Sequence, residues 1–181
     1  MTRDMDFLIE NPKGMKAKAR IPDLLKDLGF VVSFVGTKGY MKLSHTDLIL
    51  EFLVPEKGRG MDGPVPLPSL GMNATALRFL SFLTENTIEV KVEDFVVTLP
   101  HPANFALHKL MIAQRRTKEE KAIKDQDASI IILKALIADN EADSLRDVFR
   151  KTHPKWQKKI VEGLRLVDEP GLLEIITGNL I

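Results

Sequence analysis

The stretch LILEFLV, residues 48–54, decides the fold. It is short and almost wholly apolar, which is typical of a β-strand buried in a sheet. Its exception is Glu51, because an ionised side chain among apolar neighbours is costly unless it is paired, exposed or bound to a cation. Asp47 lies four residues earlier and therefore on the same strand face. The sequence predicts a strand whose acidic side chain has a specific partner or an exposed position.

A second strand is predicted at the start of the chain, in TRDMDFLIE, residues 2–10. Asp4 and Asp6 share one face of such a strand, with carboxylates close enough to bind one cation. If this strand lies beside residues 48–54, Glu51 joins them in the oxygen-rich cluster that Mg²⁺ or Mn²⁺ prefers. The alternative is that all three carboxylates are solvated charges on exposed strand positions. Spacing alone favours this alternative, since a lone Asp-x-Asp is a weak motif.

Composition restricts the class of protein. A chain of 181 residues can form one domain with a core, or one domain with a helical appendage. The net charge of +1 means that affinity for phosphate or nucleic acid must come from local patches. The absence of cysteine excludes disulfides, zinc–thiolate sites and thiol catalysis. No apolar run approaches the roughly 20 residues of a membrane span, and no signal peptide is visible, so we expect a cytoplasmic protein.

The first half of the chain is predicted to be rich in strands. Apolar spacing from Ile21 to Leu28 indicates one helix, which Gly29 ends. The stretch 55–71 is rich in proline and glycine and is predicted to be a long loop, a length that raises the chance that it covers a site. Asn73 is expected to cap a short helix that runs through Ala76, Leu77, Leu80 and Leu83. Strands are predicted at 5–9, 30–35, 40–43 and 48–54, and a hairpin at 88–92 and 95–99.

The second half is predicted to be helical, because apolar residues recur at helical spacing between prolines and polar breaks. The predicted fold class is therefore α+β, a mixed β-sheet with helices over residues 1–100 and a C-terminal helical part over 101–181. The helices are expected at 103–116, 118–138, 141–151, 155–166 and 170–177.

A basic cluster lies in HKLMIAQRRTKEEKAIKDQDA, residues 108–128. Lys109 lies between Leu107 and Leu110, where a merely solvated lysine is less expected. Such a cluster suits polyphosphate or a nucleic-acid backbone. The alternative is a solvated helix face with ordinary ion pairs, such as Lys121 with Asp125. The cations are Lys109, Arg115, Arg116, Lys118, Lys121 and Lys124, against Glu119 and Glu120.

Together these residues resemble the nucleotidyltransferase fold of the DNA polymerase beta superfamily, and in particular its bacterial minimal members of unassigned substrate. The resemblance covers most of residues 2–136. It rests on TRDMDFLI for the paired aspartates, LILEFLVP for the third carboxylate, and PHPANFALHKLMIAQRR with KAIKDQDA in the helical part.

The resemblance implies a catalytic site and its cofactor. Two Mg²⁺ or Mn²⁺ ions would be held by Asp4, Asp6 and Glu51, for in-line attack of an acceptor hydroxyl on the α-phosphate of a nucleoside triphosphate. Pyrophosphate would leave. Asp125 would position the helix that carries it. The residues expected to neutralise triphosphate charge are Arg3, Lys109, Arg115, Arg116 and Lys124.

One feature departs from the superfamily pattern. A Gly-Ser or Gly-Gly turn is expected about ten residues before the paired aspartates, where backbone amides cradle phosphate. Only residues 1–3 precede Asp4, so the sequence predicts a fragment, a wrong start or a degenerate member. The alternative function is therefore an inactive module that binds nucleic acid or a partner protein through its basic helix. A homo-oligomer is also left open.

Overall fold

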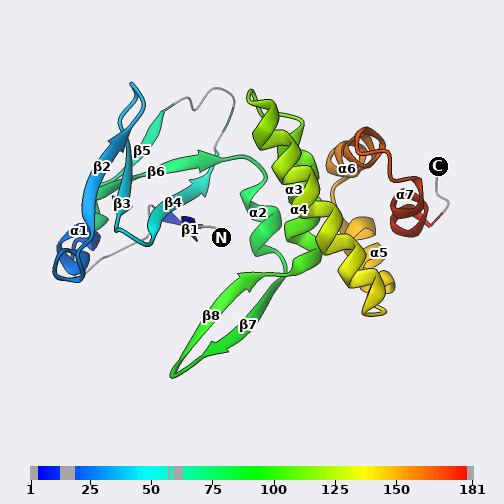
Figure 1. Ribbon diagram of the computed structural model, residues 1–181, viewed down its shortest axis with the longest axis horizontal. Coiled ribbons are helices and arrows are strands. Elements are labelled where there is room, and N and C mark those ends of the chain that lie inside the picture. The colour runs from blue at the N-terminus through cyan, green and yellow to red at the C-terminus, as the bar shows by residue number, and fades with distance from the viewer. Residues whose placement is uncertain (1–3, 13–18, 57, 59–62, 179–181) are drawn as a thin grey trace. The chain divides into compact units, whose positions relative to one another are not determined.

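A computed structural model of the chain describes residues 4–12, 19–56, 58 and 63–178 (Figure 1). The chain divides into two compact units, Met1–Ser81 and Phe82–Ile181. A mixed sheet dominates the first unit and helices dominate the second, which confirms the predicted α+β class. The expected division near residue 100 stays a prediction.

The sheet of the first unit is organised around one strand, β4 (Ile49–Pro55). This strand pairs in parallel with β1 and β6 and antiparallel with β3. The strand order is β2-β3-β4-β6-β5, with β1 paired to β4. The other strands are β1 (Asp4–Leu8), β2 (Val31–Val35), β3 (Tyr40–Ser44), β5 (Pro64–Leu67) and β6 (Met72–Leu77).

The two faces of this sheet differ in character because strand side chains alternate. Leu50, Phe52 and Val54 of β4 lie on the buried face, with Leu43 of β3 beside them. Ile21 and Leu25 of helix α1 (Ile21–Leu25) pack against this core. The helix continues as the turn η2 (Lys26–Leu28), and Gly29 ends it as predicted, with a φ of 84° that favours glycine. The opposite face carries Glu51.

Two predictions in residues 55–77 are wrong. Part of the expected loop is the edge strand β5, followed by the turn η3 (Pro68–Leu70). An edge strand tolerates Pro64 and Pro66, because proline lacks the N–H that a strand in the interior of a sheet would need for hydrogen bonding. Residues 57 and 59–62 of that loop lie outside the described residues. The predicted helix at Asn73 is mostly the strand β6, and the helix α2 spans only Leu80–Thr84.

Asn73 stabilises the sheet instead of capping a helix. Its side-chain oxygen accepts a hydrogen bond from the Met41 amide at 2.9 Å, and its side-chain nitrogen donates to the Gly39 carbonyl at 3.1 Å. The strand forms because Met72 and Ala74 alternate into the core while residues 75–77 pair with β4. Tertiary pairing therefore overrides the local capping preference.

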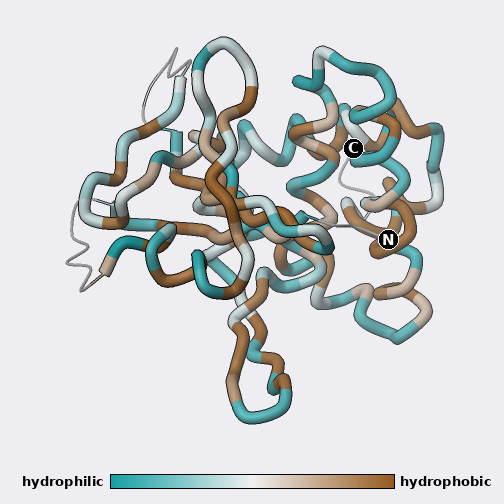
Figure 2. Tube along the Cα trace, turned by 60° about the vertical axis from the view of Figure 1, so that its left-hand side comes forward, coloured by the Kyte–Doolittle hydropathy of each residue, from teal (hydrophilic) through white to brown (hydrophobic). Residues whose placement is uncertain are grey.

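After the end of α2, the second unit contains the predicted hairpin, β7 (Thr87–Val92) and β8 (Phe95–Pro100), which the structure confirms. The apolar residues of the hairpin run along its two strands, and its tip is polar (Figure 2). The five predicted helices are also confirmed. They are α3 (Pro102–Ala113), α4 (Glu119–Ala138), α5 (Ala142–Lys151), α6 (Pro154–Leu166) and α7 (Pro170–Thr177).

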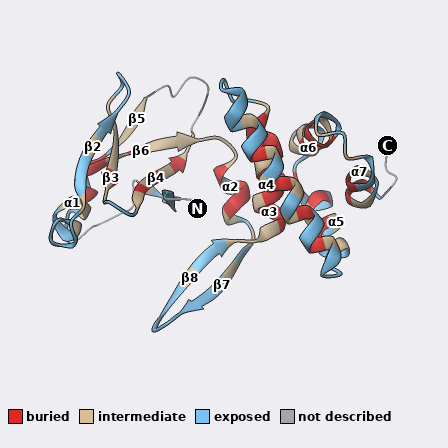
Figure 3. Ribbon diagram, in the orientation of Figure 1, coloured by how far each residue is buried: buried red, intermediate tan, exposed pale blue. Residues whose placement is uncertain are grey.

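Helix α3 forms the core of this unit. Ala106, Leu107 and Leu110 have no exposed surface, and the burial is visible along the helix in Figure 3. Pro102 occupies the first turn, where its missing N–H costs nothing, and the His101 ring accepts a hydrogen bond from the Ala103 amide at 3.2 Å. Within the described residues, no helix combines the length and the apolar content that crossing a membrane requires.

The core of the first unit predicts a clear contrast between two leucines. Leu43 is 1% exposed and Leu28 is 64% exposed. We expect Leu43→Ala to lower the free energy of unfolding by about 2–5 kcal/mol, since it removes transfer energy and leaves a cavity. Leu28→Ala should change it by less than about 0.5 kcal/mol. Urea unfolding of both variants measures the difference, and equal losses would contradict this description of the core.

Candidate active site

The pairing register of β1 with β4 brings the predicted carboxylates onto one face of the sheet. Asp6 and Glu51 are Cα partners across the two parallel strands, and Asp4 is paired with Ile49. Because residues two apart in a strand share a face, Asp4 lies on the same face as Asp6 and Glu51. The two acidic strands are therefore neighbours, which is the condition that the predicted carboxylate cluster requires.

Lys42 of β3 contacts this group, and the sequence interpretation missed it. Its ammonium nitrogen Nζ forms an ion pair with Glu51 Oε1, and the two side chains are 25% and 22% exposed. The signal was present in the alternation of Tyr40 and Lys42 with the apolar Met41 and Leu43. Only the register of β3 against β4, which pairs Leu43 with Leu50, shows that Lys42 comes next to Glu51.

Hydroxyl groups complete the neighbourhood of Lys42. Ser33 of β2 is the Cα partner of Lys42, and Ser44 lies two residues farther along β3, so all three share a face. The two serine Oγ atoms are 2.9 Å apart and share a hydrogen bond. A row of polar side chains therefore crosses this face, from Ser33 through Lys42 and Glu51 to Asp6, while Leu43, Leu50 and Phe52 are buried on the opposite face.

The residues present fit a divalent metal in part. Carboxylate oxygens are the donors that Mg²⁺ and Mn²⁺ prefer, and the backbone places Asp6 opposite Glu51. However, the described part of the chain holds no group of three acidic or histidine side chains gathered around one point. The Glu51 carboxylate is instead directed to Lys42. The backbone and the donor chemistry suit a metal, and the Glu51 side chain would have to exchange Lys42 for it.

In the second unit, Asp125 of α4 organises the basic cluster. Lys109 Nζ donates to Asp125 Oδ1 and Arg116 Nε donates to Asp125 Oδ2, both at 2.7 Å. The Asp125 side chain is only 6% exposed. Lys109 Nζ also lies 5.2 Å from the centre of the Phe105 ring, a cation–π contact. Asp125 therefore fixes two of the predicted phosphate-binding residues, in place of the alternative pairing with Lys121.

The pKa of Asp125 reflects two opposing effects. Burial raises the pKa of this carboxyl, but the hydrogen bonds from Arg116 and Lys109, with their charges, outweigh burial and hold the pKa below its usual value. The carboxylate is thus ionised at neutral pH and binds both cations as charge-assisted pairs.

The remaining predicted residues of the cluster are at the surface. Arg115 and Lys124 are exposed, as are Lys118 and Lys121, between the end of α3 and the first turns of α4. Arg3 lies outside the described residues. Lys109 keeps further ammonium protons, and Arg116 keeps its terminal N–H groups, beyond the bonds that they give to Asp125.

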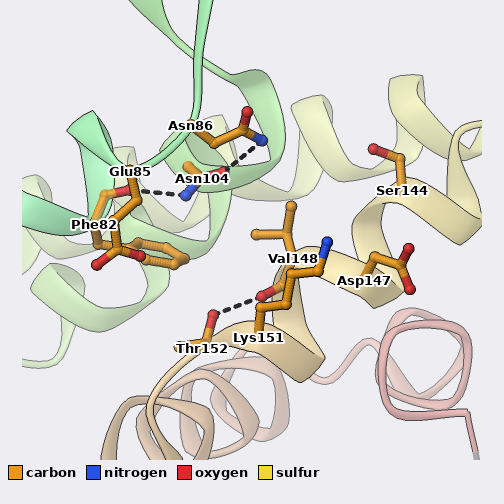
Figure 4. Close-up of a pocket in the computed structure, with 9 residues that line it drawn as sticks. All are labelled: Phe82, Glu85, Asn86, Asn104, Ser144, Asp147, Val148, Lys151 and Thr152. Atoms are coloured by element: carbon orange, nitrogen blue, oxygen red, sulfur yellow. Dashed lines mark hydrogen bonds between the residues drawn. The ribbon is translucent and has the colours of Figure 1, made fainter.

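A pocket of about 540 Å³ in the second unit is separate from these residues (Figure 4). The buried Asn104 shapes its wall by donating to the Phe82 carbonyl at 2.8 Å and accepting from Asn86 at 3.4 Å. These amides are thus engaged with the protein itself, and no predicted site residue lines the pocket. Its lining is Phe82, Glu85, Asn86, Asn104, Ser144, Asp147, Val148, Lys151 and Thr152.

Most of the chain matches a known protein family. The sequence model of a family described as nucleotidyltransferase matches residues 1–154. The chain belongs to this nucleotidyltransferase family. The matched region includes Asp4, Asp6, Glu51 and the whole basic cluster. A comparison with curated proteins finds no significant match.

Membership in a nucleotidyltransferase family gives the acidic face and the basic cluster a common chemical theme. A nucleoside triphosphate is a polyanion whose transfer chemistry is usually assisted by divalent cations and by lysine or arginine. Neither the composition nor any motif pointed to Lys42. Its ion pair with Glu51 neutralises part of the negative charge on the acidic face.

The Asp125 ion pairs predict a pH-dependent contribution to stability. A carboxyl with a lowered folded-state pKa stabilises the fold above its unfolded value of 3.8, and this contribution is lost as pH falls through the lower folded value. We expect Asp125→Asn to lower the free energy of unfolding by about 2 kcal/mol at pH 7. The difference from the unchanged protein should shrink below about pH 4.

The measurement is urea unfolding at pH 7, 5 and 3. Asp127→Asn on the exposed side of the same helix removes the same charge without touching Lys109 or Arg116, and should change stability by less than about 0.5 kcal/mol. Equal losses in the two variants, or an Asp125→Asn effect that does not depend on pH, would contradict the assigned ion pairs.

Proposed function

We propose that the chain is a Mg²⁺-dependent nucleotidyltransferase, related to the bacterial minimal members of the DNA polymerase beta superfamily. It transfers a nucleotidyl group from a nucleoside triphosphate to an acceptor hydroxyl. The observation that best supports this proposal is the register of β1 and β4, which makes Asp6 and Glu51 neighbours on one sheet face. In a nucleotidyltransferase family, metal binding would explain two carboxylates at facing positions of adjacent strands.

In the proposed reaction the nucleotidyl group passes from pyrophosphate to the acceptor oxygen, and the acceptor hydroxyl gives up its proton to water. The acceptor oxygen attacks the α-phosphorus, the bond from that phosphorus to the oxygen bridging to the β-phosphate breaks, and pyrophosphate leaves with the electron pair. Mg²⁺, when bound, supplies neutralisation of the triphosphate and a lower pKa for the acceptor hydroxyl. The residues proposed to hold it are Asp4, Asp6 and Glu51, with Glu51 released from Lys42.

The basic cluster is proposed to bind phosphate oxygens. Asp125 orients Lys109 and Arg116 and takes up only part of their donor capacity. A planar guanidinium held at Nε still presents its terminal N–H groups, which suit bidentate binding of phosphate. Arg115 and Lys124 are exposed and add positive charge nearby in the sequence. Arg3 is retained in this role as an expectation from the sequence.

The proposal predicts that activity depends on Asp6. The protein is incubated with Mg²⁺, α-labelled ATP, CTP, GTP or UTP, and a cell extract as a source of acceptors. We expect Asp6→Asn to reduce incorporation at least about 100-fold, since it removes a carboxylate from the proposed metal site. Asp27→Asn, an exposed aspartate of the first unit, is the matched control and should retain activity.

Circular dichroism of both variants establishes that they are folded. Incorporation that persists in Asp6→Asn, or that does not need a divalent cation, would contradict the proposal. Absence of incorporation from all four nucleotides would favour the second candidate function below.

That second candidate is a module that binds nucleic acid without transferring nucleotides. The observation that favours it is the run of exposed cations at the junction of α3 and α4, which is separate from the Asp125 ion pairs. Exposed lysine and arginine in such a run suit a phosphate backbone and give salt-dependent affinity. The run consists of Arg115, Lys118, Lys121 and Lys124.

This candidate predicts a different set of sensitive residues. Binding of a fluorescent single-stranded RNA should weaken steeply with salt, and Arg115→Ser with Lys124→Ser should reduce the slope by about 0.7 for each phosphate that the protein no longer neutralises. Asp6→Asn should leave binding unchanged. Salt titrations by fluorescence anisotropy measure the slopes, and RNA binding that is absent or unaffected by the two substitutions would exclude this candidate.

A further inference from the structure

We infer that Lys42 is an internal counter-ion that forms an ion pair with Glu51, and that a divalent cation must displace Lys42 to bind Glu51. Lys42 thereby sets the affinity of the acidic face for metal. This inference rests on the proposed function, because it takes Asp6 and Glu51 as metal ligands. Lys42 is not itself a proposed metal ligand, but it controls how tightly the ligands bind metal.

The need for a counter-ion follows from the register. Asp6 and Glu51 are Cα partners, and neighbouring strands lie about 4.8 Å apart, so two like charges face each other. Like charges at directly opposite positions of a sheet are destabilising. Asp4 adds a further carboxylate on the same face. The Lys42–Glu51 ion pair lowers this repulsion, and it is only about a quarter exposed, so water screens it less than a surface pair.

The surroundings of Lys42 assign this role to it. Its Cα partner Ser33 and the nearby Ser44 are neutral and hydrogen-bonded to each other. In the described part of the first unit, Arg78 is engaged elsewhere, with its Nε 2.6 Å from Glu56 Oε2. Among the described residues, it is Lys42 that supplies the positive charge in contact with Glu51 on this face.

Lysine suits an exchangeable counter-ion better than a permanent one. Its ammonium is a single charge on a flexible stem of four carbons, and 25% of the side chain reaches solvent, into which it can swing. A divalent cation carries twice the charge and can bind Asp6 and Glu51 together. The exchange is thus favourable once metal is present, but its free energy is reduced by the cost of breaking the Lys42–Glu51 pair.

The test measures Mn²⁺ affinity of the full chain by electron paramagnetic resonance, without nucleotide. Lys42→Met keeps the length and apolar stem of the side chain and removes its charge. We expect Mn²⁺ to bind this variant about five- to tenfold more tightly than the unchanged protein. Lys26→Met removes one charge from an exposed position of the same unit and should change the affinity less than about twofold.

Two further variants keep the test decisive if Lys42→Met folds poorly. Lys42→Arg retains the charge and can hold Glu51 through two parallel hydrogen bonds, so Mn²⁺ affinity should fall. In a Glu51→Gln background, Lys42→Met should no longer raise the affinity, since the ion pair that it removes is already absent. A thermal-shift measurement gives an independent readout: Mn²⁺ should raise the unfolding temperature of Lys42→Met more than that of the unchanged protein.

The outcomes separate this inference from the proposed function. Mn²⁺ binding that is abolished in Asp6→Asn but equal in Lys42→Met, Lys42→Arg and the unchanged protein would overturn the role of Lys42 and leave the metal site standing. Absence of Mn²⁺ binding in all of these proteins would overturn both. A rise in Lys26→Met equal to that in Lys42→Met would show a general charge effect and would also overturn the inference.

Discussion

The parallel pairing of β1 with β4 is the constraint on which the candidate site depends. A shift of one residue would turn every side chain of β1 to the other face and would separate the Asp6 carboxylate from Glu51. On the opposite face this register stacks the half-exposed Phe7 on the buried Phe52; the two residues are Cα partners with ring centres 5.3 Å apart. An apolar contact on one face thus fixes the position of the carboxylates on the other.

Each unit contains a carboxylate that is ion-paired with basic side chains and largely shielded from solvent, but the two carboxylates differ in burial. Asp125 is almost fully buried and holds two cations, so its ion pairs are permanent parts of the α3–α4 packing. Glu51 is more exposed and holds one lysine. Removing a partner from the first arrangement leaves a buried charge uncompensated, whereas the second can exchange one cation for another. This difference in burial is what separates a structural ion pair from an exchangeable one.

Much of the fold could be predicted because local patterns determine it: helical spacing between prolines for α3 to α7, and two apolar runs around Glu93 and Asp94 for the hairpin. The strands at residues 64–67 and 72–77 could not, because prolines and a capping residue argue against strands until an edge position and a partner are known. The sequence singles out Asp4, Asp6 and Glu51 as candidate site residues, and the structure pairs the strands that carry them. The partners of Glu51 and Asp125 do not, since they are set by strand register and by helices packed side by side.

Crystals soaked in Mn²⁺ and measured at the manganese absorption edge test the central claim most directly. We expect an anomalous peak bound by the carboxylates of Asp6 and Glu51, with the Lys42 ammonium moved away from Glu51. Asp4 should lie on the same side of the sheet as the peak. Peaks found only at other carboxylates, with Lys42 still bound to Glu51 in the soaked crystal, would contradict it.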